Sequence, residues 1–260
     1  MIEVAFLGSG STGNCAVVRS GRTALLLDAG ISPRQIGVRL GKLGMSLDDV
    51  SGLLLTHEHS DHVASAAALA TKRGLPVWGT RGTLEKAGLP GPLFADLRVV
   101  RDGEEVSFGN GDLTVRVTAT PHDGVEPVCY VFADVGGRRA GVATVLGHLS
   151  RKVLAALAGC EVLGLEANHD VDVLREGAYP AFLKKRILSD VGHLSNDAAA
   201  EGLARLLDGT TRTVVGLHLS QNNNTPALAE RALRAGLDRL GAKVALELAG
   251  PLAPTGWFRA

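Results

Sequence analysis

Three histidines and one aspartate fall within residues 57–62, which read H-E-H-S-D-H. The apolar run Gly52 to Thr56 precedes them and predicts a strand that ends at the rim of a sheet. In an extended backbone, His57 and His59 point to the same side and can bind one cation. We expect a helix to begin near Asp61 and His62, which then face elsewhere and suit a second cation. The segment therefore predicts a site for two metal ions at the edge of a sheet.

The composition excludes several classes of protein. The chain has 260 residues, is 45% hydrophobic and balances 27 basic against 27 acidic side chains. This composition is typical of a globular protein. Zero net charge argues against a protein that coats nucleic acid or membrane through its overall electrostatic field. We expect neither a signal peptide nor a membrane span, and the distant Cys15, Cys129 and Cys160 suit the reduced thiols of a cytoplasmic protein.

The pattern of short apolar runs predicts an α/β fold. Strands separated by glycine dominate residues 97–144, and an alanine-rich helix is expected over residues 63–73. The expected elements after residue 150 are helices at 153–157, 197–207 and 227–240 and strands at 162–165, 213–217 and 243–248. No linker divides the chain, so we expect residues 1–260 to form a single domain of two packed sheets flanked by helices.

Two histidines cannot hold a catalytic metal alone, so further ligands must come from other strand ends. His122 and His218 each follow a predicted strand, and both are expected ligands. His193 lies just before a predicted helix, where functional groups also gather. We do not expect His148 or His169 to bind a metal directly.

These motifs resemble those of the metallo-β-lactamase fold hydrolases over essentially the whole chain. Residues 27–30 (LDAG) are similar to the first motif, residues 57–62 to the second, His122 to the third and His218 to the fifth. The resemblance implies a four-layer αββα metallo-β-lactamase sandwich with the metals at one edge. It also implies that Asp28 braces the metal-binding loop.

More narrowly, the chain resembles the WalJ/YycJ-type group. The shared stretches are residues 8–15 (GSGSTGNC), 165–170 (LEANHD), 189–196 (SDVGHLSN) and 218–226 (HLSQNNNTP). The resemblance implies a phosphodiesterase, namely a DNA exonuclease that acts on DNA ends in DNA repair. The sequence leaves the direction of digestion open, and 5′ to 3′ is the working expectation.

The resemblance also suggests catalytic roles. Asp61 would orient the attacking water while it binds metal, and His193 would donate a proton to the departing or developing oxyanion. Glu166 would hold His193, although a strand-end surface carboxylate is the alternative. Other residues of these motifs are expected to support the ligands or the substrate: Asp28, Asn168, His169, Ser195 and Asn196.

One position departs from the family pattern. The fourth motif normally reads Thr-Asp-x-Gly and its aspartate bridges both metals, but residues 143–148 read ATVLGH and Val145 occupies that position. An isopropyl group cannot bind a cation, so a negative charge and a shared ligand are lost. The remaining ligands would be His57, His59 and His122 for one cation, and Asp61, His62 and His218 for the other. We therefore expect weaker binding of the second metal and reduced activity.

Several alternatives stay open. Imidazoles and carboxylates suit Zn²⁺, Mn²⁺ and Fe²⁺ alike, and we expect two divalent ions, zinc or manganese. The same fold could hydrolyse RNA, cyclic nucleotides, thioesters or lactones, or the chain could be a catalytically weak module that binds nucleic-acid ends. The basic triplet at residues 184–186 could contact a phosphate backbone or simply be a solvated helix end. The sequence leaves the oligomeric state open.

Overall fold

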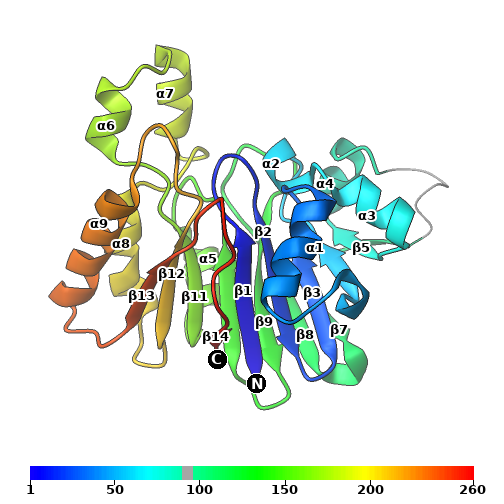
Figure 1. Ribbon diagram of the computed structural model, residues 1–260. Helices are drawn as coiled ribbons and strands as arrows, with labels where there is room; N and C mark the ends of the chain where they lie inside the picture. The colour runs from blue at the N-terminus through cyan, green and yellow to red at the C-terminus, as the bar shows by residue number, and fades with distance from the viewer. Residues whose placement is uncertain (90–95) are drawn as a thin grey trace.

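Two seven-stranded β-sheets face each other in the computed structural model, which describes residues 1–89 and 96–260 (Figure 1). The first sheet has the order β14 (Phe258–Arg259), β1 (Ile2–Gly8), β2 (Cys15–Ser20), β3 (Thr23–Leu27), β4 (Gly52–Leu54), β5 (Val77–Gly79), β6 (Leu97–Val99). The second has the order β13 (Ala245–Leu248), β12 (Thr213–Leu217), β11 (Val162–Glu166), β10 (Arg139–Ala143), β9 (Val128–Asp134), β8 (Leu113–Ala119), β7 (Glu105–Phe108). Short 3₁₀ turns lie at Leu47–Asp49 and Gly109–Gly111.

Each sheet is antiparallel in one half and parallel in the other. Strands β3, β4, β5 and β6 run parallel in the first sheet, and β10, β11, β12 and β13 run parallel in the second. Parallel strands end at the same edge of a sheet, so the loops that follow them are gathered there.

The core between the sheets is built from alternate residues of each strand. Val4 and Phe6 of β1 face Tyr130 and Phe132 of β9 in one buried cluster, whereas the intervening Ala5 belongs to the outer cluster under the helices. Because both faces of these strands are buried, their sequences are apolar almost throughout.

Helices cover the outer face of each sheet. The first sheet is covered by α1 (Pro33–Lys42), α3 (Ala66–Arg73) and α4 (Arg81–Lys86), and the second by α5 (Arg151–Leu157), α8 (Asn196–Leu206) and α9 (Pro226–Arg239). The expected four-layer αββα sandwich is therefore confirmed. Among the described residues, no helix has the length and apolar character required to cross a bilayer.

Four helices differ from the sequence-based expectation. The single helix expected over residues 63–73 is wrong, because α2 (Ser60–Val63) and α3 are separate. Ser65 lies at the break, where its amide donates to Ala29 O (2.8 Å) and its hydroxyl donates to Ile31 O (2.8 Å). The short helices α6 (Val171–Glu176) and α7 (Ala181–Ile187) were not predicted, and Figure 1 shows both projecting beyond the sheet edge.

Candidate metal centre and active site

The predicted ligands meet at one edge of the sandwich. Residues 57–62 follow β4 of the first sheet, and His122 and His218 follow β8 and β12 of the second. In the described part of the chain, the side chains that could hold a metal fall into three groups whose ligand atoms lie within 4.8 Å of one another: His57, His59 and His122; Asp61, His62 and His218; and Glu166, His193 and His218.

The first group consists of three imidazoles. The His57 ring lies 4.6 Å from the ring of His59 and 4.9 Å from the ring of His122, centroid to centroid. His122 Nδ1 donates to Gly192 O over 2.9 Å, which leaves its Nε2 for the centre of the group. His57 is fully buried, and its Nε2 has no hydrogen-bond partner within residues 1–89 and 96–260. An orphaned buried nitrogen is costly, and a cation would satisfy it.

The protonation of these imidazoles also suits a cation. Burial, together with the neighbouring histidines, holds the pKa of His57 well below its usual range. Burial and the charge of His193 lower the pKa of His122 to about 4. Neutral imidazole is the form that binds metals, so this group needs little proton release to accept one.

The second group surrounds the carboxylate of Asp61. Its Oδ2 lies 3.4 Å from His62 Nε2 and 3.3 Å from His218 Nε2. Burial alone would raise the pKa of Asp61, but hydrogen bonds from His218 and His62 hold it well below its usual range. The amide of Asn14 donates to the same Oδ2 over 3.1 Å. An anionic oxygen and two imidazole nitrogens thus converge on one point.

Asp28 fixes the orientation of the second group. Its Oδ2 accepts a hydrogen bond from His62 Nδ1 at 2.6 Å, so the opposite nitrogen of the ring faces Asp61. Burial alone would lower the pKa of His62, but Asp28 and Asp61 raise it to about 9. Asp28 Oδ1 also accepts from Thr56 N (2.8 Å), which ties β3 to the start of the histidine segment.

Glu166 holds two imidazoles at once. Its Oε1 accepts from His193 Nδ1 (2.7 Å) and His218 Nδ1 (2.9 Å), and its Oε2 accepts from the amides of Leu146 (2.8 Å) and Leu194 (3.0 Å). The residue is fully buried, so the alternative of a surface carboxylate is wrong. Burial alone would raise its pKa, but His193 and His218 lower it to about 2.

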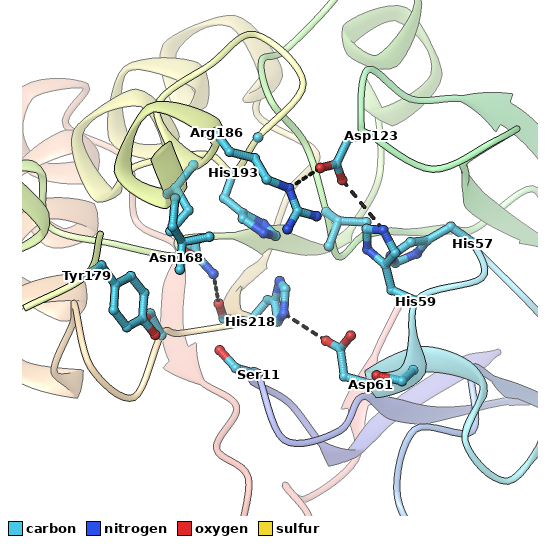
Figure 2. A pocket seen from close by; sticks show the side chains of 16 residues that line it. Ser11, His57, His59, Asp61, Asp123, Asn168, Tyr179, Arg186, His193 and His218 are labelled. Carbon is cyan, nitrogen blue, oxygen red and sulfur yellow. Dashed lines mark hydrogen bonds and ion pairs between the residues drawn. The ribbon is translucent and has the colours of Figure 1, made fainter. Parts of the chain in front are cut away.

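A cavity of about 350 Å³ opens onto these groups (Figure 2). Ligands of the first two groups line it together with His193 and Asn168, as do Ser11, Tyr179 and Arg186. Val145 also lines the cavity and is 2% exposed. The position where the sequence predicts the fourth-motif aspartate is therefore part of the cavity wall, and it presents an apolar side chain.

Asp123 and Arg186 form an ion pair beside the first group. Asp123 Oδ1 lies 3.2 Å from His122 Nε2 and 3.6 Å from His59 Nε2, while Oδ2 accepts from Arg186 Nε. Burial would raise the pKa of Asp123, but Arg186 lowers it. Asp123 was not among the predicted site residues, and its one signal in the sequence is its place next to His122. Asn14 was not predicted individually either, because only the stretch at residues 8–15 that contains it was recognised as a motif.

The other expected support residues have different surroundings. Asn168 lines the cavity and donates to His218 O over 2.8 Å. Ser195 caps α8 by accepting from Ala198 N (3.2 Å), and Asn196 donates to Asn224 Oδ1 (2.9 Å). His169 is buried and pairs with Ser195 through a backbone bridge. These last three shape the loops and do not line the cavity.

Comparison with known proteins agrees with this arrangement. A family model described as Metallo-beta-lactamase superfamily matches residues 8–140. The chain belongs to this superfamily. It is 35% identical over 242 residues to a Bacillus anthracis protein named Exodeoxyribonuclease YycJ, covering 92% of this chain and 90% of that protein. It is 33% identical over 241 residues to Exodeoxyribonuclease WalJ of Streptococcus pneumoniae, covering 90% and 88%.

A solved structure shares the fold at low identity. Zn²⁺-bound PqqB from Methylobacterium extorquens superposes with a TM-score of 0.70 at 20% identity, covering 97% of this chain and 99% of that one. The sequence identity to the two exodeoxyribonucleases confirms the resemblance to the WalJ/YycJ-type group. The chain is a metal-dependent hydrolase by family, with histidine and aspartate groups that fit metal ions.

Proposed function

We propose that the chain is a DNA exonuclease that hydrolyses phosphodiester bonds at DNA ends with 5′ to 3′ polarity. In this proposal residues 1–260 act as one metallo-β-lactamase domain in the cytoplasm and serve DNA repair. The observation that carries the proposal is the convergence of two metal-binding groups, the Glu166–His193 pair and Arg186 on one cavity. The names of the two curated relatives support deoxyribonucleic acid as the substrate.

The residues that would hold two divalent cations, zinc or manganese, are those of the first and second groups. When bound, such cations would polarise a phosphate oxygen and lower the pKa of water. The orphaned Nε2 of His57 and the converging Asp61, His62 and His218 are what support this assignment.

The protein's own residues would handle the proton and the leaving group. Glu166 accepts from His193 Nδ1, so His193 presents Nε2 to the cavity, where a protonated ring can donate to the departing oxygen. Asp61 would orient the attacking water. Glu166 is a positioning residue for His193 and His218, because a carboxylate fixes the tautomer and direction of an imidazole.

Val145 is expected to impair this centre. With valine at the position expected for the fourth-motif aspartate, each cation would lack one anionic ligand, and the repulsion between two bound cations would be less compensated. We propose that the second cation binds weakly and that turnover is reduced.

The test is a panel of substrates with the manganese- and zinc-loaded protein. DNA labelled at the 5′ end or the 3′ end, RNA, bis-p-nitrophenyl phosphate and a thioester are compared in parallel. We expect DNA to be shortened from its 5′ end, and His193→Ala to lower turnover more than metal content. Hydrolysis of the thioester alone, or of RNA in preference to DNA, would overturn the proposal.

A further inference from the structure

Two aromatic side chains belong to the turn before α7 and to α7 itself, a helix whose Leu183, Arg186 and Ile187 line the cavity. Tyr179 lines the cavity (Figure 2) and Phe182 is 75% exposed. The other phenylalanines in the described part of the chain are buried or half-buried. A single exposed apolar residue is ordinary on a protein surface. Here it lies in a helix that also contributes Arg186 to the cavity of the proposed active site.

The same helix carries a cluster of positive charge. Lys184, Lys185 and Arg186 occupy its last turn, and Phe182 and Arg186 are neighbours on the helix surface because they are four residues apart. Lys184 Nζ donates to Arg175 O (2.7 Å), whereas Lys185 is exposed. Aromatic and basic side chains thus share one surface that continues into the cavity.

The Arg186 guanidinium is fixed through one nitrogen, which leaves its two terminal nitrogens available to a ligand. Its Nε donates to Asp123, and its terminal nitrogens make no hydrogen bond within residues 1–89 and 96–260. Figure 2 shows the guanidinium directed into the cavity between His193 and His59. A planar cation fixed in this way suits a phosphate oxygen.

Tyr179 is also held in place. Its hydroxyl accepts a hydrogen bond from Asn222 Nδ2 at 2.8 Å, which ties the turn before α7 to the loop after β12. A ring that is already fixed loses little conformational freedom when a ligand stacks on it.

We propose that Tyr179, Phe182 and Arg186 form a track for single-stranded DNA that leads into the cavity. Unpaired bases would stack on the two rings while Arg186 binds a backbone phosphate, the combination that single-strand-binding proteins use. Bases inside a duplex have no free face for such stacking, so the track selects a single-stranded end. This inference rests on the proposed nuclease function and adds the strandedness of its substrate.

The test measures binding separately from hydrolysis. The metal-loaded protein is titrated into a fluorescein-labelled, phosphorothioate-linked single strand of about 12 nucleotides, a length within the usual site size, and into the matching blunt duplex. We expect the single strand to bind more tightly. Phe182→Ala should weaken its binding about tenfold, whereas Phe182→Trp should retain it. Val135→Ala is the matched control, because Val135 is 83% exposed in the turn between β9 and β10.

Arg186→Gln gives an independent measure. Loss of one phosphate contact should reduce the salt dependence of binding, with a slope in log–log form that is shallower by about one. Metal content and circular dichroism spectra identify any variant that fails to fold.

The outcomes separate this inference from the proposed function. Equal affinity of wild type and Phe182→Ala, or equal affinity for single strand and duplex, overturns the track even if DNA is hydrolysed. The track is supported if the protein binds the single strand more tightly than the duplex and if Phe182→Ala weakens that binding. If such a protein hydrolyses no DNA with any metal, only the nuclease proposal fails.

Discussion

His62 Nδ1 and Asp28 Oδ2 lie 2.6 Å apart, and both side chains are almost completely buried. Asp28 also adopts a left-handed backbone conformation, with φ of 59°. Asparagine tolerates this conformation better than most residues, so Asp28→Asn keeps the backbone and removes the charge.

We expect Asp28→Asn to lower the affinity of the second group for a divalent cation about 10- to 100-fold, as loss of a carboxylate behind a metal-binding histidine generally does. Isothermal titration with Zn²⁺ or Mn²⁺ measures the affinities of both groups, and the first group, which Asp28 reaches only through the Thr56 hydroxyl beside His57, should change less. Two unchanged affinities would contradict the role of Asp28.

Val145→Asp should restore a shared anionic ligand in the cavity wall. We expect the second cation to bind at least about tenfold more tightly and DNA hydrolysis to rise, because the carboxylate offsets two nearby positive charges. Elemental analysis after dialysis and turnover on DNA give the result. Val145→Asn introduces a side chain of the same size as aspartate but without the charge, so it should raise cation affinity and DNA hydrolysis much less. Two tightly bound metals in the unmodified chain would show that Val145 does not weaken the site.

Glu166→Gln should destabilise the fold as well as the site. A neutral amide cannot accept the four hydrogen bonds that Glu166 accepts, so we expect a loss of about 2–4 kcal/mol in the free energy of unfolding at pH 7. The lowered pKa of about 2 sets the pH dependence. The ionised form stabilises the native state above its ordinary pKa, and this contribution is lost as the pH falls towards 2.

The urea-induced unfolding of wild type and Glu166→Gln should therefore differ more at pH 7 than near pH 3. A difference that does not change with pH would mean that the charge of Glu166 contributes nothing to stability.

Gly30→Ala should disrupt the loop that carries the ligands. A Cβ at Gly30 would lie 1.7 Å from the backbone oxygen of Asp61, which also accepts from Asn14 N at 2.7 Å. The clash must displace the backbone at Asp61, so we expect a loss of about 1–3 kcal/mol or more together with weaker metal binding.

Gly41→Ala is the matched control for this substitution. An added Cβ there meets no described atom within 4 Å, and the residue lies in α1. Alanine should stabilise that helix by about 0.5–1 kcal/mol. Thermal unfolding distinguishes the two variants, and equal melting temperatures would refute the close approach of Gly30 to Asp61.

The histidine segment was predictable because its spacing and the strand before it are local properties of the sequence. Asp123 was not, because its contact with His59 joins residues 64 positions apart, and no periodicity encodes such a distance. The break between α2 and α3 was equally hidden. Alanine-rich sequence favours a continuous helix, but the hydrogen bonds from Ser65 to Ala29 and Ile31 override that local preference.

Helices α6 and α7 escaped prediction for a different reason. They have six and seven residues, too few for a periodic apolar face to stand out from chance. The basic triplet at residues 184–186 is the last turn of α7, but a helix end alone gives neither the start nor the length of its helix.

Each of the first two groups takes two ligands from the segment after β4 of one sheet, namely the loop and α2, and a histidine from a loop of the other sheet. Cations bound there would act as cross-links between the two layers of the sandwich. Occupancy would then add to resistance against unfolding, by about 2.7 kcal/mol for one cation at a hundred times its dissociation constant. A chelator should accordingly lower the melting temperature. Thermal unfolding can therefore report whether the metal centre is intact before any substrate is known.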